Sequence, residues 1–428
     1  MKMYRTVKGI GTVTLLGLVL AAGGCMGHGQ HTQEGKDLAQ TRMDQLKAGT
    51  QLQMAQQQFQ AGDLDKARKS VETALAAVPN YAQAHLLRGR IQMEQGDLEG
   101  ARQSFITAEA IEPTLADTQY YAGICYERFR QWQPAYERYT RAADMDRANP
   151  QYVVAAAEML VHLKQPEQAK ALLVERRKDF GHNAAIVQSL GNLAILEGDA
   201  EAAVVHYQDA RMLAPDDLFI LESLARAQLH ANQFADAEYN TSKLLDSIAS
   251  AEPKATANLK ARVAQKPVLS RRDLILLRAR CLVGLQRFGE AKQIYVEQAM
   301  LPEGQRDVVT WVQLGQVAAK TDDAVRLRQV AAKLLSISPD RHEGHSFRAL
   351  ALLIQGDVAA AEQAALAAAK LAPNEVDPLL LISSIMLRQG KNGEALVAAE
   401  AAARLDPSNA TAARLLQSLS ATAAAPAE

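Results

Sequence analysis

The sequence predicts an all-α protein, an α-α superhelix of the solenoid type built from stacked helix pairs, on three observations. First, one alanine recurs at a constant spacing along the chain: Ala67, Ala101, Ala135, Ala169, Ala203 and Ala237. Second, glycines and prolines keep fixed distances from these alanines, where two short helices would have to turn and stop. Third, the chain is 48% hydrophobic but only 5% aromatic, which suits closely packed, Ala-rich helices.

Residues 1–24 have the layout of a signal peptide. Three basic residues precede an apolar run from Gly9 to Leu20, and small residues then lead into Cys25. The run is too short to span a bilayer core of about 30 Å. The arrangement resembles the lipobox of bacterial lipoproteins, which implies that Cys25 becomes the acylated (palmitate-carrying) first residue of the mature chain. Ordinary signal cleavage and an uncleaved anchor are the alternatives.

Residues 25–44 are expected to be a polar tether between the lipid and the fold. The stretch from Met26 to Gln40 has no apolar period, which predicts a flexible segment.

The repeat itself is recognised by several positions that agree with one another. We call the recurring alanine the anchor of its repeat. Twelve places before it stands a small residue, four after it an aromatic or branched residue, and five before it often a glycine. The frame slips once, because the distance from Ala237 to Ala291 is that of one repeat plus an insertion. Leu327, Ala361 and Ala395 then continue the series.

This period and constellation resemble the tetratricopeptide repeat, a helix–turn–helix unit with a period of about 34 residues. The resemblance covers residues 45–408, about ten repeats. It implies an N-terminal array of six repeats at 45–250 and a C-terminal array of four at 272–408. Each helix is too short to be stable alone, so stacking must bury a continuous core between neighbouring repeats.

Two segments stand outside the repeats. The insertion, residues 251–271, is rich in Lys and Arg, and we interpret it either as a longer helix or arm between the two arrays or as a solvated loop without a partner. Residues 409–428 predict a capping helix and a tail, with Leu415, Leu416 and Leu419 facing inward and Arg414 in water.

Composition excludes several functions. The formal net charge is −1, and removal of Lys2, Arg5 and Lys8 with the signal peptide takes it to −4, so nucleic acid is not an expected partner. No phosphate loop, nucleophile elbow or clustered acid pair interrupts the repeats. We therefore expect no enzyme, no cofactor and no small-molecule substrate.

The positions of the cysteines and histidines in the sequence also give no indication of a metal site. Cys125 and Cys281 each lie ten places before an anchor, which predicts small buried thiols of the core. The motif from His342 to His345 lacks two histidines four places apart beside a glutamate, so we expect solvated polar side chains there and no metal ligands.

The candidate binding surface follows from the family resemblance. In such repeats the groove-facing places lie eight, eleven and fifteen before the anchor, which gives Phe59, Arg90, Met93, Tyr120, Arg226, Leu229, Leu276 and Arg280. Seven of the 21 aromatic residues fall in the third repeat. There Tyr120 and Tyr136 exceed the framework's needs, so they could form a binding hot spot, although an aromatic-rich core is the alternative.

These features predict a non-catalytic scaffold for protein–protein interaction in the bacterial cell envelope. The resemblance implies protein partners, and Met26 in place of an Asp implies the outer membrane, facing the periplasm. Tetratricopeptide lipoproteins serve type IV pilus or secretin assembly, polysaccharide export and outer-membrane protein insertion. We favour the first, with export or an adaptor for a peptidoglycan enzyme as alternatives.

Overall fold

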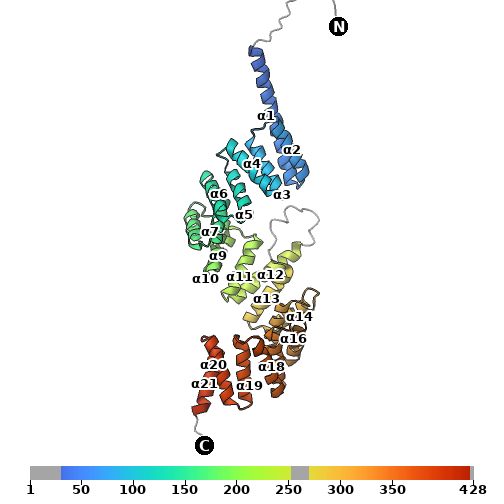
Figure 1. Ribbon diagram of the computed structural model, residues 1–428, viewed down its shortest axis with the longest axis vertical. Coiled ribbons are helices and arrows are strands. Elements are labelled where there is room, and N and C mark those ends of the chain that lie inside the picture. The colour runs from blue at the N-terminus through green and yellow to red at the C-terminus, as the bar shows by residue number, and fades with distance from the viewer. Residues whose placement is uncertain (1–29, 252–268, 425–428) are drawn as a thin grey trace, which may run out of the picture. The chain divides into compact units, whose positions relative to one another are not determined.

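The structure confirms an all-α protein. It is a computed structural model that describes residues 30–251 and 269–424, and within these ranges it contains 21 α-helices and no strand (Figure 1). The expected signal peptide, Cys25 and most of the insertion lie outside the described residues. No helix in the described ranges is both long and apolar enough to cross a membrane.

The chain divides into two compact units between Asp146 and Arg147. The first unit contains α1 (Gln30–Gln60), α2 (Leu64–Ala77), α3 (Ala82–Glu94), α4 (Leu98–Ile111), α5 (Ala116–Arg128) and α6 (Trp132–Met145).

The second unit contains the other fifteen helices in the described residues. They are α7 (Pro150–His162), α8 (Pro166–Arg177), α9 (Ala184–Glu197), α10 (Ala200–Leu213), α11 (Leu218–His230), α12 (Phe234–Ala251), α13 (Arg271–Gly284), α14 (Phe288–Met300), α15 (Val308–Lys320), α16 (Ala324–Ile337), α17 (His342–Ile354), α18 (Val358–Leu371), α19 (Val376–Arg388), α20 (Asn392–Leu405) and α21 (Ala410–Ala424).

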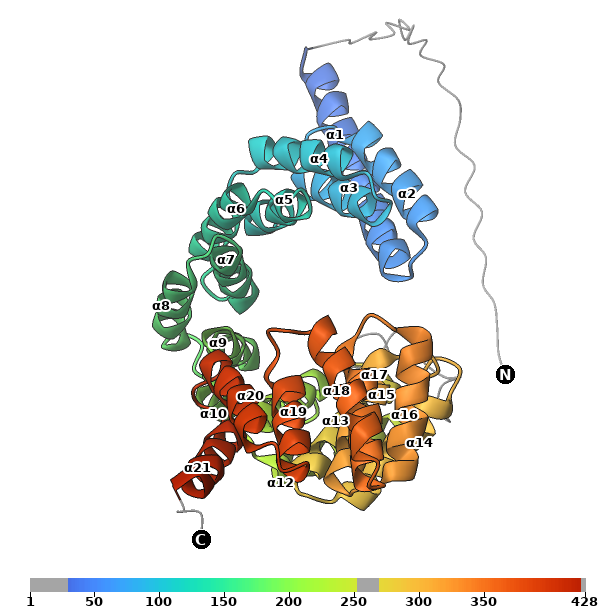
Figure 2. The same cartoon turned by 60° about the horizontal axis from the view of Figure 1, so that its bottom comes forward.

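Consecutive helices pair as hairpins, each odd-numbered helix with the even-numbered helix that follows it, and the hairpins of a unit stack side by side (Figure 2). Three hairpins belong to the first unit and seven to the second, which gives the ten repeats that the period predicts. Every anchor, from Ala67 to Ala395, is fully buried in the second helix of its hairpin. The small anchors let the two helices approach closely.

The small residue twelve before the anchor accommodates a ring from the second helix. A Cβ atom added to Gly89 would lie 2.4 Å from the Phe105 ring. At Gly123 and Gly191 the same atom would lie 2.6 Å from the ring of Tyr139 and 2.7 Å from that of Tyr207. Such distances are below van der Waals contact, so in these three repeats the position of the ring requires a glycine opposite it.

A left-handed residue turns the chain between the two helices of every repeat, always five places before the anchor. Five of these residues are the glycines 62, 96, 198, 356 and 390, which adopt a positive φ without steric cost. The other five carry side chains: Arg130, Lys164, Asn232, Gln286 and Asp322. In several repeats an aspartate follows directly and caps the second helix, as Asp97 does by accepting a hydrogen bond from the backbone N–H of Gly100.

Lys164→Gly is expected to stabilise the protein by about 0.5–1 kcal/mol. Lys164 has a φ of +63°, and this left-handed conformation costs a residue with a Cβ roughly 1–2 kcal/mol. Glycine avoids this cost, but it loses more conformational entropy on folding, so the net gain in stability is smaller. Chemical denaturation measures the change. Asn232→Gly is the matched control and should gain less, because asparagine tolerates this conformation. A loss of stability in Lys164→Gly would contradict the argument.

The two ends of the repeat array differ in how well they were predicted. At the C-terminus, Leu415, Leu416 and Leu419 of α21 pack against α19 and α20 while Arg414 is exposed, which confirms the capping helix. At the N-terminus, the expectation of a flexible segment up to Gln40 is wrong from Gln30 on, because α1 begins there. The Gln, Glu, Lys, Leu and Ala residues of this stretch favour a helix even without apolar contacts.

Candidate functional site

In the described part of the second unit, three clefts lie on the faces of first helices. The first lies between α7 and α9 and has a volume of about 160 Å³. The second lies between α9 and α11, at about 330 Å³, and the third is lined by α11, α13 and α15, at about 550 Å³. Asn192 and Leu196 line both of the first two clefts, so these form one continuous groove.

Each cleft has the same kind of floor, the side chain four places after an anchor. This residue is Leu173 in the first cleft, Tyr207 in the second and Tyr295 in the third. All three are at most 3% exposed. The clefts are therefore equivalent spaces in successive parts of one repeating lattice, and they differ in the side chains that fill and rim them.

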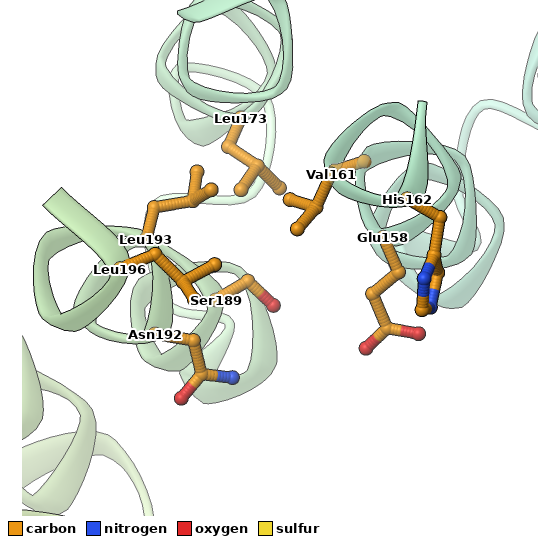
Figure 3. A pocket seen from close by; sticks show the side chains of 9 residues that line it. Glu158, Val161, His162, Leu173, Ser189, Asn192, Leu193 and Leu196 are labelled. Atoms are coloured by element: carbon orange, nitrogen blue, oxygen red, sulfur yellow. The ribbon is translucent and has the colours of Figure 1, made fainter. Parts of the chain in front are cut away.

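The first cleft is mainly apolar. Val161 of α7, Leu173 of α8 and Leu193 of α9 point toward one another across it (Figure 3). Leu196 is 64% exposed at its edge, a high value for so large an apolar side chain. Glu158 and Asn192 bring polar groups to the opening. Such a shape offers an apolar side chain a place to be buried.

The second cleft combines aromatic and basic groups. The Tyr207 hydroxyl donates a hydrogen bond of 2.7 Å to Asn192 Oδ1, and burial raises the pKa of this tyrosine to about 12. Arg226 rims the cleft and lies 3.8 Å from the carboxylate of Glu222, which is 3% exposed. Glu222 also accepts a hydrogen bond from the backbone N–H of Leu269, so it ties the end of the insertion to α11.

The third cleft is the most basic. Arg280 of α13 and Lys320 of α15 line it, together with the apolar side chains of Leu229 and Val283. Among the residues that the structure describes, no carboxylate lies within 4.0 Å of the Arg280 guanidinium. The groove of the second unit therefore changes from apolar at α7 and α9 to positively charged at α13 and α15.

The first unit holds a different arrangement, in which Arg90 of α3 lies between two rings. Its guanidinium carbon is 5.0 Å from the ring centre of Phe59 on α1 and 4.8 Å from that of Tyr121 on α5. Such stacking holds the charged group in place. Tyr121 in turn stacks on Phe105, at 6.0 Å between ring centres.

Tyr120 belongs to the same aromatic packing. Its ring lies 5.5 Å from that of the core residue Tyr139 and 5.3 Å from that of Tyr121. Tyr120 thus packs partly as a framework residue, which is the alternative stated above for this aromatic-rich repeat. Tyr136 lies on the second helix, α6, whereas the other candidates of this repeat array lie on first helices.

The structure brings only some of the predicted binding residues to a cleft. Arg226 lines the second cleft, and Leu229 and Arg280 line the third. Met93 is 6% exposed and belongs to the core, and Leu276 packs against the core that includes Tyr295. Residues that line the clefts but were not predicted include His162, Leu196 and Lys320.

The remaining polar candidates have structural roles. Cys125 and Cys281 are free and fully buried, as predicted, and burial raises the pKa of each thiol to about 11. Glu343 in the histidine motif forms an ion pair with Arg341. In the described part of the chain, no group of three His, Cys, Asp or Glu side chains could hold a metal ion.

Stacked helix hairpins with a groove along their first helices define a helical repeat protein. Residues 52–115 of the first unit and 317–376 of the second match the family model described as tetratricopeptide repeat. The chain therefore contains tetratricopeptide repeats in both units. Members of this family generally act as non-catalytic scaffolds for protein interaction, and no enzyme family is indicated.

Solved structures with this fold include three whose overlap with the chain is extensive. The type IV pilus biogenesis factor PilW is 16% identical, with a TM-score of 0.43 over 50% of this chain and 97% of that one. A tetratricopeptide repeat protein from Parabacteroides merdae is 14% identical, with a TM-score of 0.42 over 64% and 99%. PilF from Pseudomonas aeruginosa is 14% identical, with a TM-score of 0.37 over 61% and 94%. No curated protein matches the sequence.

Proposed function

We propose that this protein is a membrane-anchored scaffold of the bacterial cell envelope that binds a partner protein in the groove of its second unit. The observation that carries the proposal is the series of three clefts, apolar at α7 and α9 and basic at α13 and α15. A segment with apolar side chains followed by acidic ones complements this groove. Peptide-binding grooves in helical proteins take apolar anchors in pockets, and charges at the rim select the partner.

The attachment to the membrane and the location of the protein are part of the same proposal. The basic start, the short apolar run and the small residues before Cys25 support a lipoprotein held in the outer membrane and facing the periplasm. We propose that the protein takes part in the assembly of a type IV pilus or a secretin. Polysaccharide export and an adaptor role for a peptidoglycan enzyme are the alternatives, and a neighbouring gene for a secretin, a polysaccharide synthase or a murein hydrolase would discriminate among the three.

Reversing the charge of the third cleft is expected to weaken partner binding by roughly tenfold or more, about 1.4 kcal/mol. The double variant Arg280→Glu/Lys320→Glu places negative charges where the groove is most basic, so it should repel an acidic partner segment. Affinity capture from detergent-solubilised envelopes, followed by quantitative mass spectrometry, compares this variant with the wild-type chain. The proteins that only the wild type captures should also be lost at high salt.

Arg404→Glu is the matched control, because Arg404 is exposed on the second helix α20, away from the clefts. This variant should capture partners as the wild type does. Equal capture by the wild type and the groove variant would overturn the proposed role of the groove, provided that both chains show the same helical circular dichroism and thermal melt.

A further inference from the structure

The cleft between α7 and α9 reaches Ala157, twelve places before its anchor, whereas a ring lies against that place in the third and fifth repeats. In the second, third and fifth repeats, a glycine twelve before the anchor faces a ring four after it. The fourth repeat has Ala157 and Leu173 at these two places. Leu173 is 1% exposed, but its side chain is shorter than a tyrosine, and both residues line the cleft. The space that a ring fills elsewhere is therefore open.

The size and walls of this space suit one aromatic ring. Its volume is about 160 Å³, and an apolar protein cavity of about 150 Å³ is known to bind benzene. Val161, Leu193 and Leu196 provide apolar walls from the two first helices (Figure 3). An aromatic side chain can enter from the groove, because the cleft opens at the exposed edge that Leu196 forms.

The polar rim points to a tyrosine among the aromatic side chains. In the fifth repeat the Tyr207 hydroxyl donates to Asn192, eleven places before the anchor, at 2.7 Å. In the third repeat the Tyr139 hydroxyl donates to the Glu127 carboxylate at 2.6 Å. Glu158 occupies in the fourth repeat the place that Asn192 occupies in the fifth, and it lies at the opening of the cleft. A phenol hydroxyl can thus donate to the Glu158 carboxylate, and hydrogen bonds to a charged acceptor are the stronger kind.

We propose that this cleft binds a tyrosine side chain of the partner segment, which takes the place of the ring that the fourth repeat lacks. The proposal rests on the groove function proposed above and adds the identity of one partner side chain that the groove binds. The ring is buried between α7 and α9, and its hydroxyl donates to Glu158. The acidic residues of the same segment then lie toward α13 and α15, where Arg280 and Lys320 line the groove.

The test uses p-cresol, the side chain of tyrosine as a free molecule, so it needs no partner. In the methyl NMR spectrum of the purified chain, p-cresol should shift the signals of Val161, Leu173, Leu193 and Leu196 in a saturable manner. Toluene, which lacks the hydroxyl, should bind more weakly, and Glu158→Leu should remove that difference. Saturable binding with this pattern supports the proposal, and the absence of shifts at these methyl groups overturns it.

A second test fills the cleft with an aromatic ring of the chain itself. Leu173→Tyr/Ala157→Gly copies the pair of the fifth repeat and should weaken p-cresol binding by at least roughly tenfold. Its thermal melt should not fall, because the ring fills existing space. If this variant does not fold, Leu196→Glu changes only the exposed edge and should also weaken binding, whereas Leu366→Tyr on the exposed face of α18 should not.

The two proposals can fail separately. Loss of partner capture in Arg280→Glu/Lys320→Glu together with no binding of p-cresol leaves the groove function standing and removes the tyrosine. Unchanged p-cresol binding in both the filled variant and Leu196→Glu likewise overturns the assignment of the ring to this cleft.

Discussion

Tyr139→Ala is expected to lower the free energy of unfolding of the third repeat by about 3–5 kcal/mol, the usual cost of truncating a large buried aromatic side chain. Tyr139 is 1% exposed, and its ring lies against Gly123, where a Cβ would come within 2.6 Å. Its hydroxyl also donates to Glu127. The substitution therefore opens a cavity between α5 and α6 and leaves a polar side chain without one of its hydrogen bonds.

The effect should be local, because each repeat of a solenoid contacts only its neighbours. Hydrogen exchange monitored by mass spectrometry should show faster exchange in α5 and α6 and unchanged exchange in α17 to α20. Tyr120→Ala should cost about 1–2 kcal/mol, since its ring packs on Tyr139 at 5.5 Å but remains partly exposed. Tyr136→Ala is the control on the same helix as Tyr139 and should cost less than either. A loss in Tyr120→Ala as large as that in Tyr139→Ala would assign Tyr120 wholly to the core.

Cys25→Ser is expected to move nearly all of the protein from the membrane to the soluble fraction. If Cys25 carries several acyl chains, as we propose, its loss removes a hydrophobic attachment of roughly 0.8 kcal/mol per buried CH₂ group. Fractionation of cells after expression of the full chain measures the shift, and metabolic labelling with a fatty-acid analogue measures the modification. The wild type should be labelled and Cys25→Ser should not.

Cys125→Ser provides the control for this experiment. Cys125 is fully buried, and its pKa of about 11 keeps the thiol protonated and unreactive at neutral pH. That variant should keep both the label and the membrane association. A wild-type chain that sediments with membranes without any label would contradict acylation, and unchanged sedimentation of Cys25→Ser would contradict the anchor.

Most of the fold could be predicted because one physical requirement recurs in every repeat. Ala203 and Tyr207 are readable as packing positions because the first of these places is alanine in most other repeats and the second is aromatic or branched in several of them. The helical start of α1 at Gln30 was not predictable in this way, because its exposed side chains, such as Leu38 and Met43, carry no apolar period. The division between Asp146 and Arg147 also leaves no mark in the spacing of the anchors.

The site was predictable only to the level of a face. Counting back from the anchors places Arg226 and Arg280 on the groove side of first helices, where the structure has them. The same counting does not give the distance between two neighbouring first helices. It therefore selected Met93 as a groove residue, although Met93 is buried in the structure. The departure of Leu173 from the aromatic pattern was visible in the sequence, but its meaning depends on the space that a shorter side chain leaves.

The pairing of a small residue with a ring has a consequence for how such a chain can be recombined. Gly123 and Tyr139 belong to the two helices of one hairpin, so that whole hairpin can be duplicated or transplanted without separating the two partners. A crossover between its two helices would separate Gly123 from the ring that packs against it. Gly315 is different, because the ring against it belongs to Phe347 of the following hairpin. A gene fusion cut between α16 and α17 would therefore break a matched pair, whereas a cut between α10 and α11 would leave Gly191 and Tyr207 together.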